Sequence, residues 1–273
     1  MGDALEHRTT GDKRSFIDEY LEDIYMTNRA NKEVKDIIIE AFDKMRIHNA
    51  SRNLTLWAID LPLALFLADC VKPQWTTLET GCGLTTVALA ALGTHHYCVV
   101  PSIDEVKRLR AYCESISLPL NRVTFIVERS EDALPKLDLY EFDLSIIDGR
   151  HAFPSPFIDF YYMAERLKLG GLLVVDDICI WTGRILSDFL ESEKEWDRVK
   201  KFHNTIVFEK LSNGTHEKEW NSQPLVIARS RVAVALFHCR QRAHTFIFLL
   251  KAKYFKMIYK KIAHRLFRSG RSE

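Results

Sequence analysis

Long apolar runs, paired cysteines and an N-terminal leader are all missing from this sequence. The longest apolar pieces, such as Thr245 to Leu250, fall well short of the ~20 residues that a transmembrane helix needs. The chain opens M-G-D-A-L-E-H-R, without the basic and apolar regions of a secretory signal. The six cysteines show no C-x-x-C spacing, which is typical of thiols in a reducing compartment. We therefore expect a cytoplasmic protein.

A third glycine is missing from the turn Gly81-Cys82-Gly83. This turn follows a β-prone segment at Thr76–Thr80 and precedes a helical pattern at Thr85–Leu92. A strand that ends at two glycines and continues as a helix exposes bare backbone, and the free N–H groups of the helix favour a small-molecule site there. A nicotinamide site would need a further glycine near Thr86, so an NAD(P)-dependent oxidoreductase is a less favoured alternative.

Acidic residues are nearly missing from residues 231–273, which hold eleven Lys/Arg against Glu273 alone, a net charge of +10. The preceding 230 residues carry −9. Apolar residues at 255, 258, 259, 262 and 266 have helical spacing, which predicts a basic amphipathic tail. Such a helix favours an anionic membrane surface, and hence a peripheral membrane location, or self-association as a homo-oligomer. No RNA-binding signature accompanies it, so no nucleic-acid partner is expected.

The middle of the chain alternates strand and helix patterns, which predicts an α/β fold with a mostly parallel sheet covered on both faces. Strands are predicted at Thr76–Thr80, Tyr97–Pro101, Arg122–Val127, Phe142–Ile147 and Leu172–Val175, and a final antiparallel pair at Thr205–Leu211 and Pro224–Ala228. Helices are predicted at Asp60–Val71, Thr85–Leu92, Asp104–Ser115, Phe157–Leu167 and Arg184–Ser192.

Two further helices, from Ser15 and from about Lys32, precede the glycine turn and pack on the core or cover the substrate. The expected organisation is a helical cap over residues 1–59, a catalytic domain over residues 60–230 and the basic tail over residues 231–273.

Carboxylates end two neighbouring predicted strands: Asp148 follows one, and Asp176 and Asp177 follow the next. Neighbouring strands lie ~4.8 Å apart, so these side chains can converge at one sheet edge. Acids gathered in this way repel one another unless a cation joins them. Oxygen ligands favour Mg²⁺ and also suit Mn²⁺ or Ca²⁺. The alternative is that Asp177 caps the next segment and Asp176 orients a loop.

Four motifs occur in order along these elements: Leu78-Glu79-Thr80-Gly81-Cys82-Gly83, Ser130-Glu131-Asp132, Asp148-Gly149-Arg150-His151 and Val174-Val175-Asp176-Asp177. Together they resemble a class I S-adenosylmethionine-dependent methyltransferase, over residues 60 to 230. The Asp-Gly-x-His and Val-Val-Asp-Asp pair is similar to the catechol, caffeoyl-coenzyme A and macrocin-type sugar O-methyltransferases. The resemblance implies a Rossmann-like seven-stranded sheet whose final strand is antiparallel.

The resemblance also implies roles for individual residues. Glu79, just before the glycines, would meet the ammonium of the methionine moiety. The acid that grips the ribose in such enzymes is missing after the second strand, where Ser102 and Asp104 stand instead. The full set of implied S-adenosylmethionine-binding residues is Glu79, Gly81, Gly83, Ser102, Asp104, Ser130, Glu131 and Asp148.

The implied reaction is O-methylation of a small-molecule or sugar hydroxyl with divalent-metal assistance. Asp148, Asp176 and Asp177 would hold the metal, and Asp148 and His151 would be catalytic. Histidine exchanges protons near neutral pH, which suits His151 to the role of general base, although the catechol-type enzymes tend to carry lysine there. The alternative is a non-catalytic relative that keeps the fold as a scaffold or as a membrane-associated binding protein.

Overall fold

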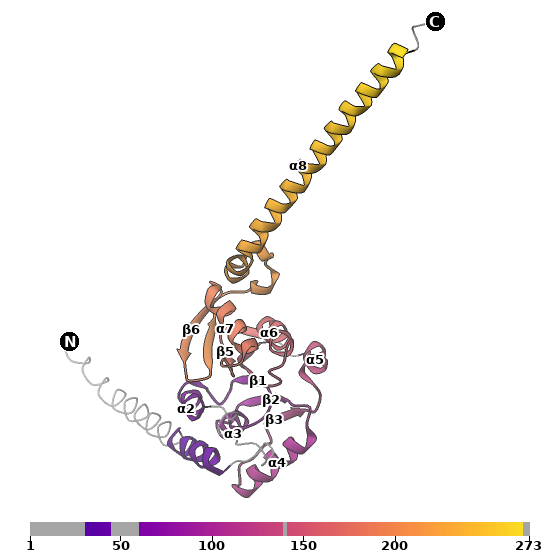
Figure 1. The fold of residues 1–273 in the computed structure, drawn as a ribbon. Helices are drawn as coiled ribbons and strands as arrows, with labels where there is room; N and C mark the ends of the chain where they lie inside the picture. Colours follow the sequence, from indigo (N-terminus) through magenta and orange to yellow (C-terminus); the bar gives the residue numbers. More distant parts are fainter. Residues whose placement is uncertain (1–30, 45–59, 139–140, 270–273) are drawn as a thin grey trace, which may run out of the picture. The chain divides into compact units, whose positions relative to one another are not determined.

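The computed structural model describes residues 31–44, 60–138 and 141–269. The chain divides into two compact units, Met1–Glu217 and Lys218–Glu273. The first contains the sheet and the helices on its two faces, and the second contains one long helix (Figure 1).

The sheet has seven strands in the described residues, in the spatial order β3-β2-β1-β4-β5-β7-β6. The five strands from β3 to β5 are parallel, while β7 is antiparallel to both β5 and β6. The α/β, Rossmann-like prediction with an antiparallel strand near the end is therefore confirmed. The strands are β1 (Thr76–Thr80), β2 (His95–Val99), β3 (Val123–Ile126), β4 (Phe142–Ile147), β5 (Leu167–Val175), β6 (Trp196–Lys201) and β7 (Ile206–Lys210).

Helices cover both faces of this sheet (Figure 1). One face packs under α2 (Leu61–Cys70), α3 (Leu84–Ala91) and α4 (Ile103–Ser115), where alternate strand residues such as Cys98 and Ile146 are fully buried. The other face packs under α5 (Ser130–Ala133), η2 (Leu134–Lys136), α6 (Ser155–Arg166) and α7 (Trp181–Ser192). Strands buried on both faces explain the near-continuous apolar runs in the sequence.

Two segments that precede the sheet are described only in part. The predicted helix from Ser15 lies outside the described residues, whereas residues 31–44 are helical, as the pattern from about Lys32 predicts. Ile38 and Ala41 of that helix are fully buried against the α2, α3 and α4 side. The helix predicted from Asp60 is also confirmed, with Asp60 at its N-cap position and proline in its first turn.

The predicted final antiparallel pair was half wrong. The strand at Thr205–Leu211 is β7, but its hairpin partner is β6, and Pro224–Ala228 begins a helix. Proline suits the first turn of a helix because its missing N–H has no partner there in any case. The β6 strand escapes detection because it is a charged edge strand, in which only Trp196 is buried.

The second unit consists of η4 (Trp220–Ser222) and α8 (Pro224–Ser269), which runs for 46 residues. The predicted C-terminal helix is thus present and begins before residue 231. Over the part of the chain that the structure describes, no helix is both long and apolar enough to cross a membrane.

Candidate active site

The carboxyl ends of the central strands meet at one edge of the sheet, and glycines bring their loops into contact there. Gly81 has φ of +88°, a left-handed conformation that L side chains rarely adopt. Its N–H donates to the Val99 carbonyl over 2.9 Å, which ties the turn to β2. A Cβ on Gly81 would lie 2.2 Å from the Asp148 carbonyl oxygen. The loops after β1 and β4 can therefore touch only because residue 81 has no side chain.

Gly83 has a different role in the same turn. It is the N-cap of α3, with extended backbone, and its N–H donates to the Thr86 hydroxyl over 2.9 Å. A Cβ on Gly83 would meet no atom within 4 Å. The N-terminus of α3, where the helix dipole is positive and the first N–H groups lack helical partners, thus lies beside open space. The turn has the bare backbone that the sequence predicts, and cofactor binding by these N–H groups stays a prediction.

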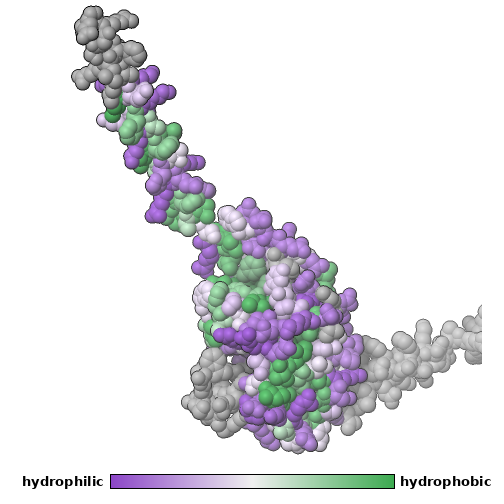
Figure 2. All heavy atoms as spheres, turned by 90° about the vertical axis from the view of Figure 1, so that its right-hand side faces the viewer, coloured by the Kyte–Doolittle hydropathy of each residue, from purple (hydrophilic) through white to green (hydrophobic). Residues whose placement is uncertain are grey.

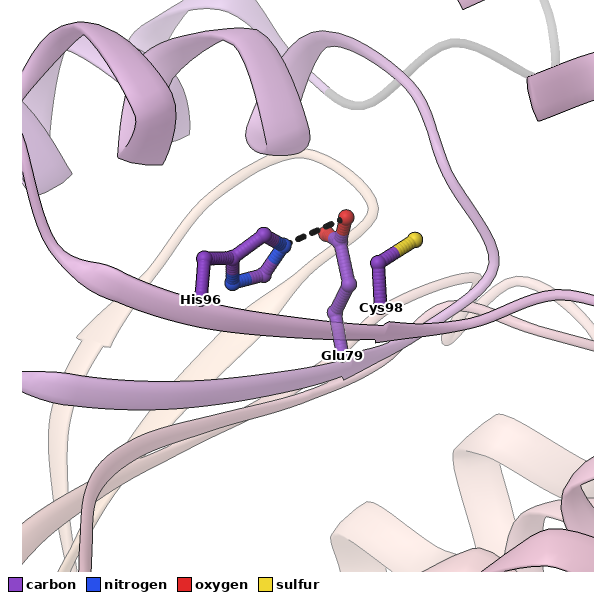
Figure 3. Close-up of side chains that lie close together, drawn as sticks. All are labelled: Glu79, His96 and Cys98. Atoms are coloured by element: carbon purple, nitrogen blue, oxygen red, sulfur yellow. Dashed lines mark hydrogen bonds and ion pairs between the residues drawn. The ribbon is translucent and has the colours of Figure 1, made fainter. Parts of the chain in front are cut away.

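Glu79, the predicted ammonium ligand, is buried with only 1% of its surface exposed. Its carboxylate accepts hydrogen bonds from the hydroxyls of Thr85, at 2.6 Å, and of Thr86. His96 Nε2 lies 3.0 Å from the same carboxylate (Figure 3). Glu79 therefore links β1 to β2 and to the first turn of α3, and contact with a ligand ammonium stays a prediction.

Cys98 completes a buried set with Glu79 and His96, side by side on β1 and β2 in Figure 3. Their ligand atoms lie within 4.8 Å of one another, and carboxylate, imidazole and thiol are donors that zinc accepts. Each is already engaged, however: Cys98 Sγ lies 3.0 Å from the Gly81 carbonyl oxygen, and His96 Nδ1 lies 2.8 Å from the Thr77 hydroxyl. We assign this set to the structural support of the glycine turn.

Of the three acids predicted to hold a metal, Asp148 and Asp176 come into contact, whereas Asp177 contacts Asn204 and His151 instead. Asp148 keeps 21% of its side chain exposed, while Asp176 and Asp177 are buried. Burial raises the pKa of Asp148 well above its ordinary value, and the neighbouring charge of Asp176 raises it further. Burial likewise raises the pKa of Asp176, which the hydrogen bond from Thr205 partly offsets. Two carboxyls in contact cannot both ionise freely without a cation.

His151 stands between the acids of the two strands. Its Nε2 lies 3.1 Å from Asp177 Oδ2 and 3.8 Å from Asp148 Oδ1. The main chain also holds the residue, because the Thr182 hydroxyl of α7 donates to the His151 carbonyl. The imidazole side chain is 22% exposed and so can be reached from outside.

The loop that carries Asp176 and Asp177 is braced from both sides. Asp177 has φ of +53°, and a Cβ on Gly183 of α7 would lie 2.6 Å from its carbonyl oxygen. Asn204 Nδ2 donates to Asp177 Oδ1 over 2.6 Å, and the Thr205 hydroxyl donates to Asp176 Oδ1. Asn204 and Thr205 precede β7, and sequence reasoning missed them because the hairpin that presents them includes β6.

The remaining predicted residues follow β2 and β3. Ser102 caps α4, where its hydroxyl accepts from the Glu105 N–H over 3.3 Å, and Asp104 is exposed and 3.5 Å from Lys107 Nζ. Ser130 is buried at the start of α5, and Glu131 lies 3.7 Å from Arg129. These residues lie in or next to the first turns of α4 and α5, and their contacts are with the protein itself. Their roles in cofactor binding stay predictions.

Comparison with known proteins agrees with this description. Residues 78–178 match the family model described as a methyltransferase domain. No curated protein sequence matches the chain.

Solved structures of similar fold include a putative O-methyltransferase from Klebsiella pneumoniae, at 14% identity and a TM-score of 0.49, covering 67% of this chain and 90% of that one. An O-methyltransferase from Bacillus cereus in complex with SAH has 16% identity and a TM-score of 0.48, covering 72% and 97%. An rRNA methylase from Streptococcus thermophilus has 13% identity and a TM-score of 0.44, covering 60% and 100%.

The matched segment runs from β1, through the glycine turn, to the loop after β5, and so includes the four motifs of the sequence. Residues 78–178 thus match a methyltransferase domain over the same motifs that predict a class I S-adenosylmethionine-dependent methyltransferase.

Proposed function

We propose that this chain methylates a hydroxyl oxygen of a small molecule or sugar with the help of a divalent cation. One observation supports this proposal above the others. Asp148 and Asp176 meet at the sheet edge where His151 also lies, and Asp148 touches the glycine turn through its main chain. A methyl donor on that turn and an acceptor on the acids would be neighbours.

The residues of the site fit both a methyl donor and a divalent cation. Open space at Gly83 and the N-terminus of α3 suit the polar end of S-adenosylmethionine. The pKa of Asp148 is raised by burial and by the charge of Asp176, and a bound cation would relieve this repulsion. Asp148 and Asp176 would hold the cation. When bound, S-adenosylmethionine supplies a methyl group on a good leaving group, and Mg²⁺ or Mn²⁺ supplies a Lewis acid that acidifies a hydroxyl.

The chain's own residues then have three tasks. His151 takes the acceptor proton at Nδ1, while its Nε2, 3.1 Å from Asp177 Oδ2, donates to that carboxylate, which stabilises the resulting imidazolium. Asn204 and Gly183 fix the Asp177 loop, so the base keeps its orientation. Trp181, 60% exposed at the start of α7, offers an aromatic wall for the acceptor.

The test needs no knowledge of the acceptor. The EPR signal of Mn²⁺ should fall as the ion binds wild-type protein, whereas Asp176→Asn should weaken binding at least about tenfold, because one of two carboxylates is lost. Asp197→Asn, an exposed acid on β6, is the matched control and should bind like wild type. Equal Mn²⁺ affinity in all three proteins would exclude the metal from these acids.

A non-catalytic scaffold is the second candidate, because Glu79 is engaged inside the protein and no acid follows β2 directly. Calorimetry with S-adenosylhomocysteine separates the two. Binding heat supports the methyltransferase, and the absence of heat at millimolar ligand favours the scaffold.

A further inference from the structure

The α8 helix has a charge pattern unlike that of the rest of the chain. Its 46 residues, Pro224–Ser269, include eleven Lys/Arg and neither Asp nor Glu. Lysine and arginine on ordinary surface helices are usually interspersed with acids that pair with them. This helix therefore carries a positive charge that no acid of its own balances.

Large apolar side chains are exposed along the same helix. Phe246, Phe248 and Phe255 are 63%, 70% and 68% exposed, and Tyr259 is 76% exposed. Figure 2 shows hydrophobic surface alternating with hydrophilic surface along the helix. The exposed run over residues 246–250 is entirely apolar. Apolar surface on this scale marks a binding surface.

The apolar and basic residues separate onto different faces beyond residue 247. Phe248, Phe255 and Tyr259 are spaced by seven and four residues and share one face of the helix. Lys253, Lys256 and Lys260 are spaced by three and four residues and share another. The helix is thus amphipathic over its basic half, with aromatic rings on one side and ammonium groups on the other.

Charge decides between the possible partners. Pairing of α8 with α8 of a second copy would bring eleven cations against eleven with no carboxylate between them. Nucleic acid would satisfy the cations but leave the aliphatic and aromatic face in water. An anionic lipid surface satisfies both, because acyl chains take the apolar face and headgroups take the lysines.

We propose that α8 binds in the plane of an anionic phospholipid interface and so attaches the methyltransferase unit to a membrane. Phe248, Phe255 and Tyr259 enter the headgroup and acyl boundary, and the lysines from 251 to 261 bind the headgroups. The first 230 residues carry −9, so attachment depends on α8 and weakens as salt screens the lysines.

Vesicle flotation of the full-length chain tests the proposal, with phosphatidylcholine vesicles that contain or lack phosphatidylglycerol. Wild-type protein should float with the anionic vesicles only. A basic-face variant replaces five lysines by glutamine, and its partition coefficient should fall at least about hundred-fold. The five positions are Lys251, Lys253, Lys256, Lys260 and Lys261.

The matched control removes the same charge from exposed lysines of the first unit and should float like wild type. Its five positions are Lys72, Lys107, Lys136, Lys194 and Lys201. A third variant, with Phe248, Phe255 and Tyr259 replaced by serine, keeps the charge and should lose binding.

Three results would overturn the proposal: no flotation of wild-type protein, equal loss in the control, or equal binding to neutral vesicles. Light scattering, which measures the oligomeric state, tests whether α8 binds a second copy of the chain instead. A stable dimer that the serine variant dissociates, without flotation of wild type, would assign the apolar face to self-association.

Discussion

Glu79 near the end of β1 and the pair Asp148 and Asp176 after β4 and β5 lie in different surroundings. Glu79 is enclosed, and its oxygens accept from Thr85, Thr86 and His96. Asp148 and Asp176 face each other, and the pKa of each is raised by burial. A buried carboxylate that several protein donors satisfy supports structure, whereas two carboxylates in contact with each other are candidates for cation binding. Glu79 therefore supports the structure of the site, while Asp148 and Asp176 are candidates for its chemistry.

The largest expected effect is the loss of Glu79. Glu79→Ala would leave His96 and two threonine hydroxyls without their acceptor in the core and should lower the free energy of unfolding by about 3–5 kcal/mol. Urea denaturation at neutral pH measures this. A change within about 0.5 kcal/mol, as for a surface residue, would contradict the structural role.

A third buried acid sharpens the comparison. Asp159 of α6 is fully buried, and burial raises its pKa from 3.8 to about 6. Because the folded-state pKa exceeds the unfolded one, the stabilising effect of the protonated acid is complete below about pH 4 and is lost as pH rises through about 6.

Asp159→Asn should therefore stabilise the protein above pH 7 by about 1–3 kcal/mol and flatten the pH dependence of stability between pH 4 and 7. Urea midpoints across that pH range are the measurement. If the stability of the variant depends on pH as that of the wild type does, the buried carboxyl of Asp159 does not cause this pH dependence.

Asp148→Asn should have the smallest effect and the opposite sign to that of Glu79→Ala. With chelator present, the neutral amide removes the repulsion with Asp176 and should raise the free energy of unfolding by about 1 kcal/mol. Added Mg²⁺ should stabilise wild type and leave this variant unchanged, because binding to the folded state stabilises it. Destabilisation of the variant in chelator would place Asp148 with Glu79 as a structural acid.

The local sequence pattern predicts those parts of the site that lie in a single strand or in the loop that follows it. The two-glycine turn after β1 follows from residues 76–92 alone, and Asp148 and Asp176 end apolar strands. The support for these residues comes from distant sequence. His96 reaches Glu79 because β1 and β2 pair Thr77 with His96 and Glu79 with Cys98, a register that composition does not specify. Asn204 and Thr205 depend on the charged edge strand β6, whose exposed residues hide the alternation that marks a strand.

The central claim is that the open space beside Gly83 belongs to S-adenosylmethionine. Gly83→Ala tests it most directly, because the backbone there is extended and a Cβ meets no atom within 4 Å. Calorimetric titration with S-adenosylhomocysteine should show affinity reduced at least about tenfold, a loss of about 1.4 kcal/mol, with Tm unchanged. Wild-type affinity in the Gly83→Ala protein would contradict the claim, because the cofactor would then lie elsewhere.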